Sequence, residues 1–258
     1  MILSELIQRS PIRIFEQSIH GGLKAGEIGV IASPNGVGKT SVLVQLAMDK
    51  LLQGKKVIHV SFTQHNQYVP LWYDDIFTEF TIKKNLENAA EIKNELVKNR
   101  VLMNFNQDGV TKDQILKSLR AMIIEGGFKA DSIIIDGFDF ARHSAASCAA
   151  VASSTSVTSV LNKEKETDLF ANFKAVKNFA TEMGVSIWYS CSVNEGAQYD
   201  KENIPVALGS FINNIDIVIV LQPKKDHVEL SISKDRDSVI SKSMAMNLDP
   251  KTLLILEA

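Results

Sequence analysis

The sequence has few cysteines and no long apolar run, and both absences exclude classes of protein. Its two cysteines, Cys148 and Cys191, belong to no CxxC pair and to no Cys/His cluster with the spacing of metal ligands. We therefore expect reduced thiols and a cytoplasmic protein. No stretch approaches the ~18 consecutive apolar residues of a spanning helix, so no membrane partner is expected. The beginning of the chain, with Glu5, Arg9 and Pro11, lacks the pattern of a signal peptide.

The chain also lacks an excess of charge of either sign. Its 28 basic and 30 acidic residues leave a net charge of −2, which provides no general attraction to nucleic acid or to an anionic membrane. With 258 residues, 45% of them apolar, the composition suits a globular α/β protein. We expect a single domain over 1–258, with an N-terminal extension over 1–12 and a flexible Ser/Ala-rich loop over 142–162.

Short apolar runs alternate with stretches of helical periodicity, which predicts an α/β fold with a mainly parallel central sheet flanked by helices. The predicted strands are 28–32, 56–62, 101–105, 132–136, 185–191 and 215–221. Residues 227–235 and 243–248 then alternate at period two, which predicts antiparallel strands at the C-terminal edge of the sheet. The predicted helices follow the first strand as far as Gly54, run from a cap at Thr111 to Gly126–Gly127, and run from Leu169 to a stop at Gly184.

Residues 33–40 read SPNGVGKT and stand between an apolar strand and an apolar helix. A loop in this setting presents backbone N–H groups at a helix N-terminus, where they and the helix dipole bind an anion. Lys39 has the reach to contact β- and γ-phosphates, and the Thr40 hydroxyl suits Mg²⁺. Ser33 stands where the usual pattern has its first glycine, and a negative φ would tolerate it there. The predicted phosphate-binding residues are Ser33, Pro34, Asn35, Gly36, Val37, Gly38, Lys39, Thr40 and Ser41.

The run SIIID places an acidic residue, Asp136, at the end of a buried strand. By itself such a residue only marks where a strand leaves the core. Downstream of a phosphate loop, with a strand and a helix between, it becomes a specific candidate for holding Mg²⁺ through a water. The sequence therefore predicts ATP and Mg²⁺ as cofactors, with Thr40 and Asp136 as the metal-binding residues.

The stretch GGLKAGEIGVIASPNGVGKTSVLVQLAMDKLLQGKKVIHVS resembles the beginning of RecA-like P-loop ATPase domains of the KaiC and DnaB-helicase type. Those domains have a Gly-Gly-Leu turn, a short strand, the phosphate loop, a helix and a second strand. Further on, LGSFINNIDIVIVLQ and HVELSISKDRDS resemble the DnaB-type glycine-serine turn, Asp-led strand and strand ending in Lys-x-Arg. The resemblance covers roughly residues 12–240 and is weak over 64–130 and 141–165.

The resemblance implies a role for Lys234 and Arg236, the Lys-x-Arg pair. In the family this pair reaches the γ-phosphate held by a neighbouring subunit, where cations stabilise transition-state charge as an arginine finger does. The resemblance also implies a homo-oligomeric ring or filament, commonly hexameric, with nucleotides between subunits. On charge patterning alone, SKDRDS is equally well explained as a solvated turn.

Polar residues follow the fifth predicted strand in WYSCSVNEG. Ser190, Ser192 and Asn194 are three candidates for a hydrogen bond to the γ-phosphate. The strand register decides among them, and the sequence leaves that open.

The chain lacks the glutamate that, in this family, follows the second strand and activates the attacking water. In VSFTQHNQ, Thr63 or Gln64 stands at this position, and the first carboxylate downstream is Asp74. A neutral Gln64 can position water by hydrogen bonding but is not a strong base. His65 is an alternative, although a lone histidine in a polar turn is more often solvated. The catalytic candidates are Lys39, Gln64, Lys234 and Arg236.

The two loops that face the ring centre in DNA-binding members of the family are poor in cations here. ARHSAASCAAVASSTSV offers Arg142 and His143, and NEGAQYDKENIPVALGS has three acidic residues against Lys201. Binding to DNA phosphates requires several lysines or arginines, and single strands also stack on aromatic side chains, of which these loops have only Tyr199. The sequence argues against a processive DNA motor.

Three functions fit these observations. The leading hypothesis is an ATP-binding protein with weak or conditional ATPase activity, acting through nucleotide-dependent oligomerisation or signalling. The alternative is a DNA-dependent ATPase of recombinase or helicase type, which the Lys-x-Arg element favours. The third is a nucleotide-gated scaffold that assembles without turnover.

Overall fold

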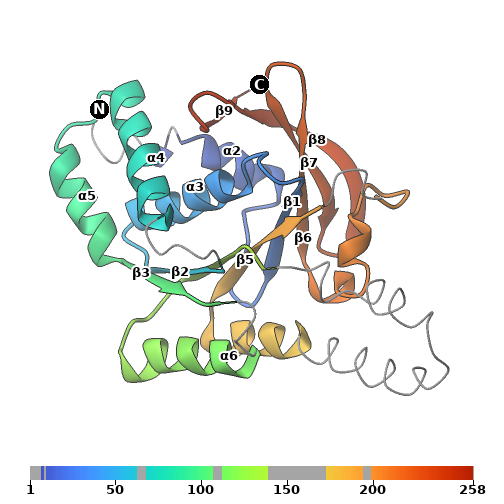
Figure 1. The fold of residues 1–258 in the computed structure, drawn as a ribbon, viewed down its shortest axis with the longest axis horizontal. Helices are drawn as coiled ribbons and strands as arrows, with labels where there is room; N and C mark the ends of the chain where they lie inside the picture. The colour runs from blue at the N-terminus through green and yellow to red at the C-terminus, as the bar shows by residue number, and fades with distance from the viewer. Residues whose placement is uncertain are drawn as a thin grey trace.

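Nine strands in the described part of the chain form one sheet, with helices on both faces (Figure 1). The structure is a computed structural model and describes residues 7–8, 10–62, 68–106, 112–138, 173–193 and 199–257. The strand order is β3-β2-β4-β5-β1-β6-β7-β8-β9. The parallel strands are β1 (Ile28–Ser33), β2 (Val57–Ser61), β3 (Arg100–Asn104), β4 (Ser132–Asp136), β5 (Ser186–Ser192) and β6 (Ile217–Pro223).

Antiparallel strands complete one edge of the sheet: β7 (Val228–Asp235), β8 (Ser238–Leu248) and β9 (Ile255–Glu257). The predicted α/β class, with a mostly parallel sheet and antiparallel C-terminal strands, is confirmed. Two strands begin two or more residues away from the predicted position. β6 begins at Ile217 because a 3₁₀ turn, Ile212–Asn214, precedes it, and β8 begins directly after a tight turn from β7. The sequence pattern did not predict β9.

Helices α2 (Pro11–Ser18), α3 (Lys39–Leu52), α4 (Tyr68–Lys84) and α5 (Ala89–Lys98) cover one face of the sheet. The other face carries α6 (Lys112–Arg120), the π-helical turn Ala121–Glu125 and the helical residues 173–183. The parallel strands β1, β2 and β4 are buried on both faces, which explains why they form continuous apolar runs, whereas β3 is only partly buried. Gly127 (φ +64°) and Gly184 (φ +66°) follow the helices that they were predicted to end.

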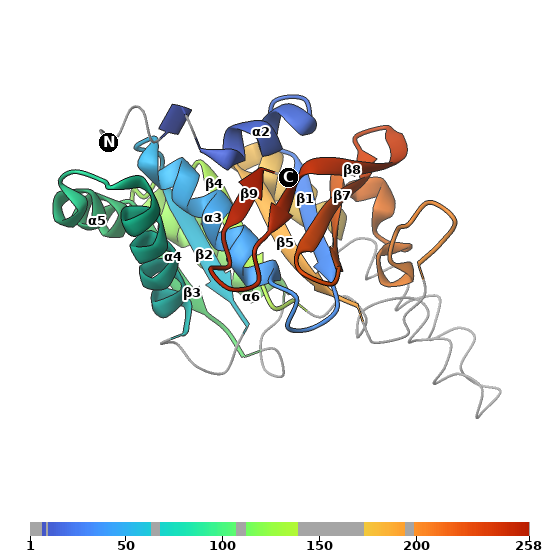
Figure 2. The same cartoon turned by 90° about the horizontal axis from the view of Figure 1, so that it is seen from above.

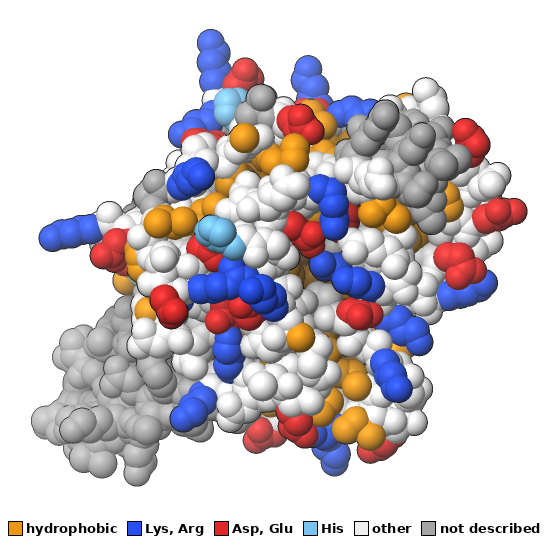
Figure 3. All heavy atoms as spheres, turned by 180° about the vertical axis from the view of Figure 1, so that it is seen from behind, with side chains coloured by type: hydrophobic (Ala, Val, Ile, Leu, Met, Phe, Trp, Pro, Cys, Tyr) orange, Lys and Arg blue, Asp and Glu red, His pale blue; other side chains and the backbone are white. Residues whose placement is uncertain are grey.

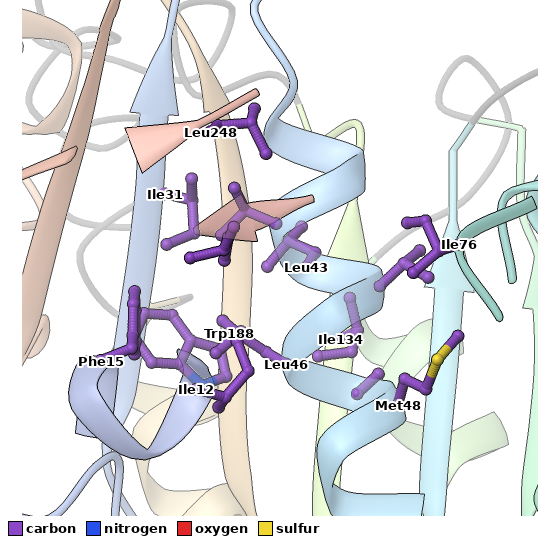
Figure 4. Packing of buried hydrophobic residues seen from close by; sticks show 14 of the residues in the cluster. Ile12, Phe15, Ile31, Leu43, Leu46, Met48, Ile76, Ile134, Trp188 and Leu248 are labelled. Carbon is purple, nitrogen blue, oxygen red and sulfur yellow. The ribbon is translucent and has the colours of Figure 1, made fainter. Parts of the chain in front are cut away.

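The core on the α3 face joins the beginning of the chain to the central strands (Figure 4). Ile12, at the end of the predicted extension, is buried, and the ring of Phe15 meets Trp188 edge-on at 6.0 Å. Trp188 lies against Gly29 of β1, where an added Cβ would come within 2.3 Å of the indole. The packing of Phe15 on Trp188 and of Trp188 on Gly29 places α2 against β1, the strand that leads into the predicted phosphate loop.

The surface mixes charges of both signs. On the face in Figure 3, lysine and arginine side chains lie among acidic ones rather than apart from them. Ion pairs between exposed side chains include that of Arg120 with Glu182, at 2.5 Å. Within the described ranges, no helix combines the length and the apolar character needed to cross a membrane.

Candidate functional site

Residues 34–38 join β1 to α3 as an open loop at the carboxyl end of the parallel strands. Gly36 (φ +78°) and Gly38 (φ +116°) have left-handed backbone, which side chains disfavour. Gly38 is also the residue before α3, where the first N–H groups of a helix have no intrahelical acceptor. Ser33 ends β1 in extended backbone, so its side chain meets no φ penalty. The loop therefore has the form that an anion site at a helix N-terminus requires.

Lys39 lies inside this loop rather than in solvent. Its Nζ donates to the carbonyl oxygens of Pro34 (2.9 Å) and Ser33 (3.1 Å) and lies 3.5 Å from Ser33 Oγ. Burial lowers the pKa of Lys39, and the nearby Cys191 and Asp136 oppose that effect. A phosphate oxygen could replace either carbonyl as the acceptor, because these bonds are to neutral groups and a charged acceptor is stronger.

The two predicted metal-binding residues lie in contact. Thr40, in the first turn of α3, donates from Oγ1 to Asp136 Oδ2 at 2.8 Å, and Asp136 ends β4. A hydroxyl and a carboxylate are hard oxygen ligands of the kind that Mg²⁺ prefers. The described residues contain no group of three or more His, Cys, Asp or Glu side chains that could hold a metal. The pair therefore fits Mg²⁺ that takes its other ligands from water and phosphates, as Mg²⁺ commonly does.

The strand register separates the candidates for a γ-phosphate contact. Ser190 Oγ accepts a hydrogen bond from Gly137 N at 2.7 Å, so it ties β5 to the residue after Asp136. Ser192 pairs in register with Ser33 and lies beside the start of the phosphate loop. Asn194 lies outside the described residues. Of the two serines described, Ser192 is the better placed to face a ligand in the loop.

Gln64, the candidate for positioning water, lies outside the described residues, as do Thr63 and His65. The structure describes the two ends of that connection. β2 ends at Ser61, which pairs in register with Asp136, and α4 begins at Tyr68. The connection therefore leaves the sheet beside the Thr40–Asp136 pair.

Lys234 and Arg236 lie near the amino end of β1, whereas the predicted phosphate loop of the same chain follows its carboxyl end. Asp235, between them, pairs with Ile217, and Ile217 pairs with Gly29 near the beginning of β1. The loop leaves the other end of β1, about 13 Å further along the strand. Neither cation can reach a nucleotide in its own loop, so a role at a γ-phosphate would have to be in a neighbouring subunit.

The guanidinium of Arg236 uses all five of its N–H donors within the chain. Nε and Nη2 bind the Glu27 carboxylate at 2.9 and 3.0 Å, and Nη1 binds Asp235 at 2.6 Å. The two remaining bonds go to the carbonyl oxygens of Ile19 (3.2 Å) and Gly22 (2.9 Å). Arg236 thus joins the turn after α2 to the β7–β8 hairpin.

A cavity of about 290 Å³ adjoins the first turn of α3, and the sequence reasoning did not find it. Its lining comes from α4 and from a distant part of the chain: Tyr68, Leu71, Trp72, Asp75, Ile76, Thr252 and Leu253. Ser41, next to Thr40, donates to the carbonyl oxygen of Leu253, which places the cavity beside the phosphate loop. In the sequence, the aromatic pair in YVPLW was the only sign of this cavity. The opposite wall comes from Thr252 and Leu253, almost two hundred positions later.

A buried histidine, His59, lies on the same face of the sheet and was also missed. It is fully buried in β2, and Nδ1 lies 3.1 Å from the Tyr73 hydroxyl of α4, while Nε2 has no hydrogen-bond partner among the described residues. Burial lowers the pKa of His59 to about 4; Asp136 opposes this effect and Arg100 adds to it. His59 is therefore neutral at pH 7.

The protonation of His59 should make the protein less stable in acid. Its pKa is about 4 when folded and 6.5 when exposed, so between these values the unfolded chain binds more protons. The free energy of unfolding should be fully retained above pH 6.5 and should fall toward pH 4, by at most roughly 3 kcal/mol from this residue. Urea unfolding at both ends of this range, compared with His59→Gln, measures the difference. Identical losses in both proteins would contradict this prediction.

A scan of protein-family models and a search of curated protein sequences find no match to this chain.

Proposed function

We propose that this chain is a RecA-like P-loop protein of the KaiC and DnaB type that binds ATP with Mg²⁺ and hydrolyses it weakly or conditionally. It would act through nucleotide-dependent oligomerisation or signalling. The observation that supports this most is the 2.8 Å hydrogen bond between Thr40 and Asp136, beside the buried ammonium of Lys39 at the start of α3. A strand–helix turn that binds nothing has no need of a buried cation, a hydroxyl and a carboxylate in one place.

The phosphates would lie against the N–H groups of residues 35–41, with Lys39 on the β- and γ-phosphates. Thr40 and Asp136 would hold Mg²⁺, which neutralises phosphate charge when bound. The carboxyl ends of parallel strands are where open α/β sheets bind ligands, and β1 has β5 on one side and β6 on the other. The loop, the lysine and the acidic residue all lie at that edge.

The cavity beside Ser41 supports a nucleotide rather than a free phosphate as the ligand. It offers aromatic and aliphatic surface from Tyr68, Trp72 and Leu253, on which a base can stack. Asp75 and Thr252 add polar groups that can orient it. A nucleotide with its phosphates in the loop would have to extend past Ser41 and Leu253 for its base to reach this cavity.

Weak hydrolysis follows from the absence of a carboxylate in residues 62–73, which comprise the connection after β2 and the beginning of α4. Without a strong general base there, the attacking water would be oriented only by neutral groups such as Gln64. We expect turnover well below the ~1 s⁻¹ at the low end of ordinary enzymes.

Calorimetric titration with ATP and Mg²⁺, followed by phosphate release with and without single-stranded DNA, tests this function. Saturable binding with slow, DNA-independent turnover is expected, with an ATP-dependent increase in size by light scattering. Strong stimulation by DNA would favour the recombinase or helicase alternative. Assembly without any phosphate release would favour the scaffold, and no ATP binding would exclude all three functions.

A further inference from the structure

The buried side chain of Gln45 joins α3 to a segment more than two hundred residues later. Gln45 is 1% exposed, and its amide makes a pair of hydrogen bonds with the backbone of that segment. Nε2 donates to Leu253 O at 2.9 Å, and Oε1 accepts from Ile255 N at 2.8 Å. A buried amide is stable only when such bonds are made, so this pairing determines where residues 253–255 lie.

The same amide also holds the first turn of the phosphate-loop helix. Gln45 Nε2 lies 3.2 Å from both the carbonyl oxygen and the hydroxyl of Ser41. Ser41 Oγ in turn donates to Leu253 O, so this one carbonyl accepts from both side chains. Ser41 directly follows Thr40. A shift of Leu253 would therefore displace Ser41, the residue next to the proposed metal-binding hydroxyl of Thr40.

Residues 249–257, which we call the latch segment, are shaped to present that carbonyl. The Asp249 carboxylate accepts from Thr252 Oγ1 at 2.7 Å and from Lys251 N at 3.0 Å, and Asp249 N donates to Leu254 O at 2.9 Å. Leu253 has a left-handed backbone (φ +58°), which costs a non-glycine residue about 1 kcal/mol or more. The turn is maintained against this cost by its contacts with α3.

Apolar packing joins the latch segment and its neighbour β8 to the loop as well. Leu248, at the end of β8, lies where a Cβ on Gly38 would come within 2.4 Å of its Cδ2. Leu254 and Ile255 are buried in the same cluster as Leu43 of α3. Figure 2 shows β9 over α3, and Figure 4 shows Leu248 beside the helix.

We propose that the latch segment positions the phosphate loop, with Gln45 and Ser41 as positioning residues that couple nucleotide binding to the order of residues 249–257. The proposal rests on the proposed function, because it concerns the same loop. Coupling of this kind is reciprocal: if an intact latch favours nucleotide binding, bound nucleotide must favour the intact latch. Nucleotide binding in the loop would then change the order of the latch segment, which lies at the antiparallel edge of the sheet.

Gln45→Met tests the proposal, since it keeps the length of the side chain and removes both polar groups. We expect ATP affinity with Mg²⁺ to fall about tenfold. In the parent protein, ATP should slow amide hydrogen exchange in residues 249–257, and this protection should be lost in the variant. The matched control is Gln53→Met, the same change at the far end of α3, where the amide binds Asp49 instead. It should keep both the affinity and the protection.

Unchanged affinity in Gln45→Met, or equal loss of protection in both variants, would overturn the coupling. The two proposals fail separately. If the parent binds no ATP, the proposed function falls, and the latch is then judged without ligand by amide exchange in residues 36–42. Faster exchange there in Gln45→Met than in Gln53→Met supports the latch, and equal exchange overturns it.

Discussion

Lys39→Ala should abolish ATP binding, with a loss of affinity of at least ~100-fold, while the fold persists. The Nζ of Lys39 is a buried cation held inside the loop, and its bonds are to neutral carbonyl oxygens of Ser33 and Pro34. Removing the ammonium removes its attraction to the phosphates, which is strong because the site has a low dielectric constant. The fold should tolerate the change, because burying an ammonium without a carboxylate contributes little to stability. Calorimetric titration and circular dichroism measure the two effects.

The pH dependence of binding should follow the same side chain. Because burial lowers the pKa of Lys39 from 10.5, the free protein loses this charge at a lower pH than an exposed lysine would. ATP affinity should therefore decline on the alkaline side with a midpoint below 10.5. The matched control is Lys55→Ala, just beyond α3, which should bind like the parent. Parent-like affinity in Lys39→Ala would show that the phosphate site has been wrongly assigned.

Arg236→Ala should destabilise the protein by about 2–4 kcal/mol, the second large effect. The change removes five hydrogen bonds, leaves the Glu27 carboxylate without its cation, and leaves the Asp235 carboxylate paired with the ring of His20 but not with a guanidinium. Asp235 is nearly buried, so solvent cannot fully replace the lost partner. Urea unfolding measures the loss. Arg236→Lys should fall between parent and alanine, because an ammonium keeps the charge but has only three donors.

Arg120→Ala is the matched control for this prediction. Arg120 also makes a bidentate pair, with Glu182, but both side chains are largely exposed, so the loss of stability should be much smaller than that of Arg236→Ala. The resemblance to DnaB-type proteins implies that Arg236 instead reaches a neighbouring subunit. An Arg236→Ala protein that is as stable as the parent but has lost an assembly-dependent activity would favour that role over the structural one.

The parts of the site that the sequence predicted are those carried by one contiguous stretch. Gly36, Gly38, Lys39 and Thr40 act within a single turn, and the strand before and the helix after them are visible as apolar periodicity. Asp136 could also be predicted, because the carboxyl ends of parallel strands meet at one edge. The positions of these residues depend on local backbone geometry and on burial, and both leave a pattern in nearby residues.

The sequence by itself determined the α/β class, the loop at the end of β1 and the absence of a carboxylate after β2. Only the tertiary structure decided that Arg236 is held by Glu27 and that Gln45 meets Leu253, partners that are more than two hundred positions apart. No periodicity encodes such pairs, because their meeting depends on how the whole sheet stacks its strands. In the sequence, a polar side chain such as Gln45 cannot be distinguished from an ordinary helix residue, because its partner Leu253 is adjacent only in the folded chain.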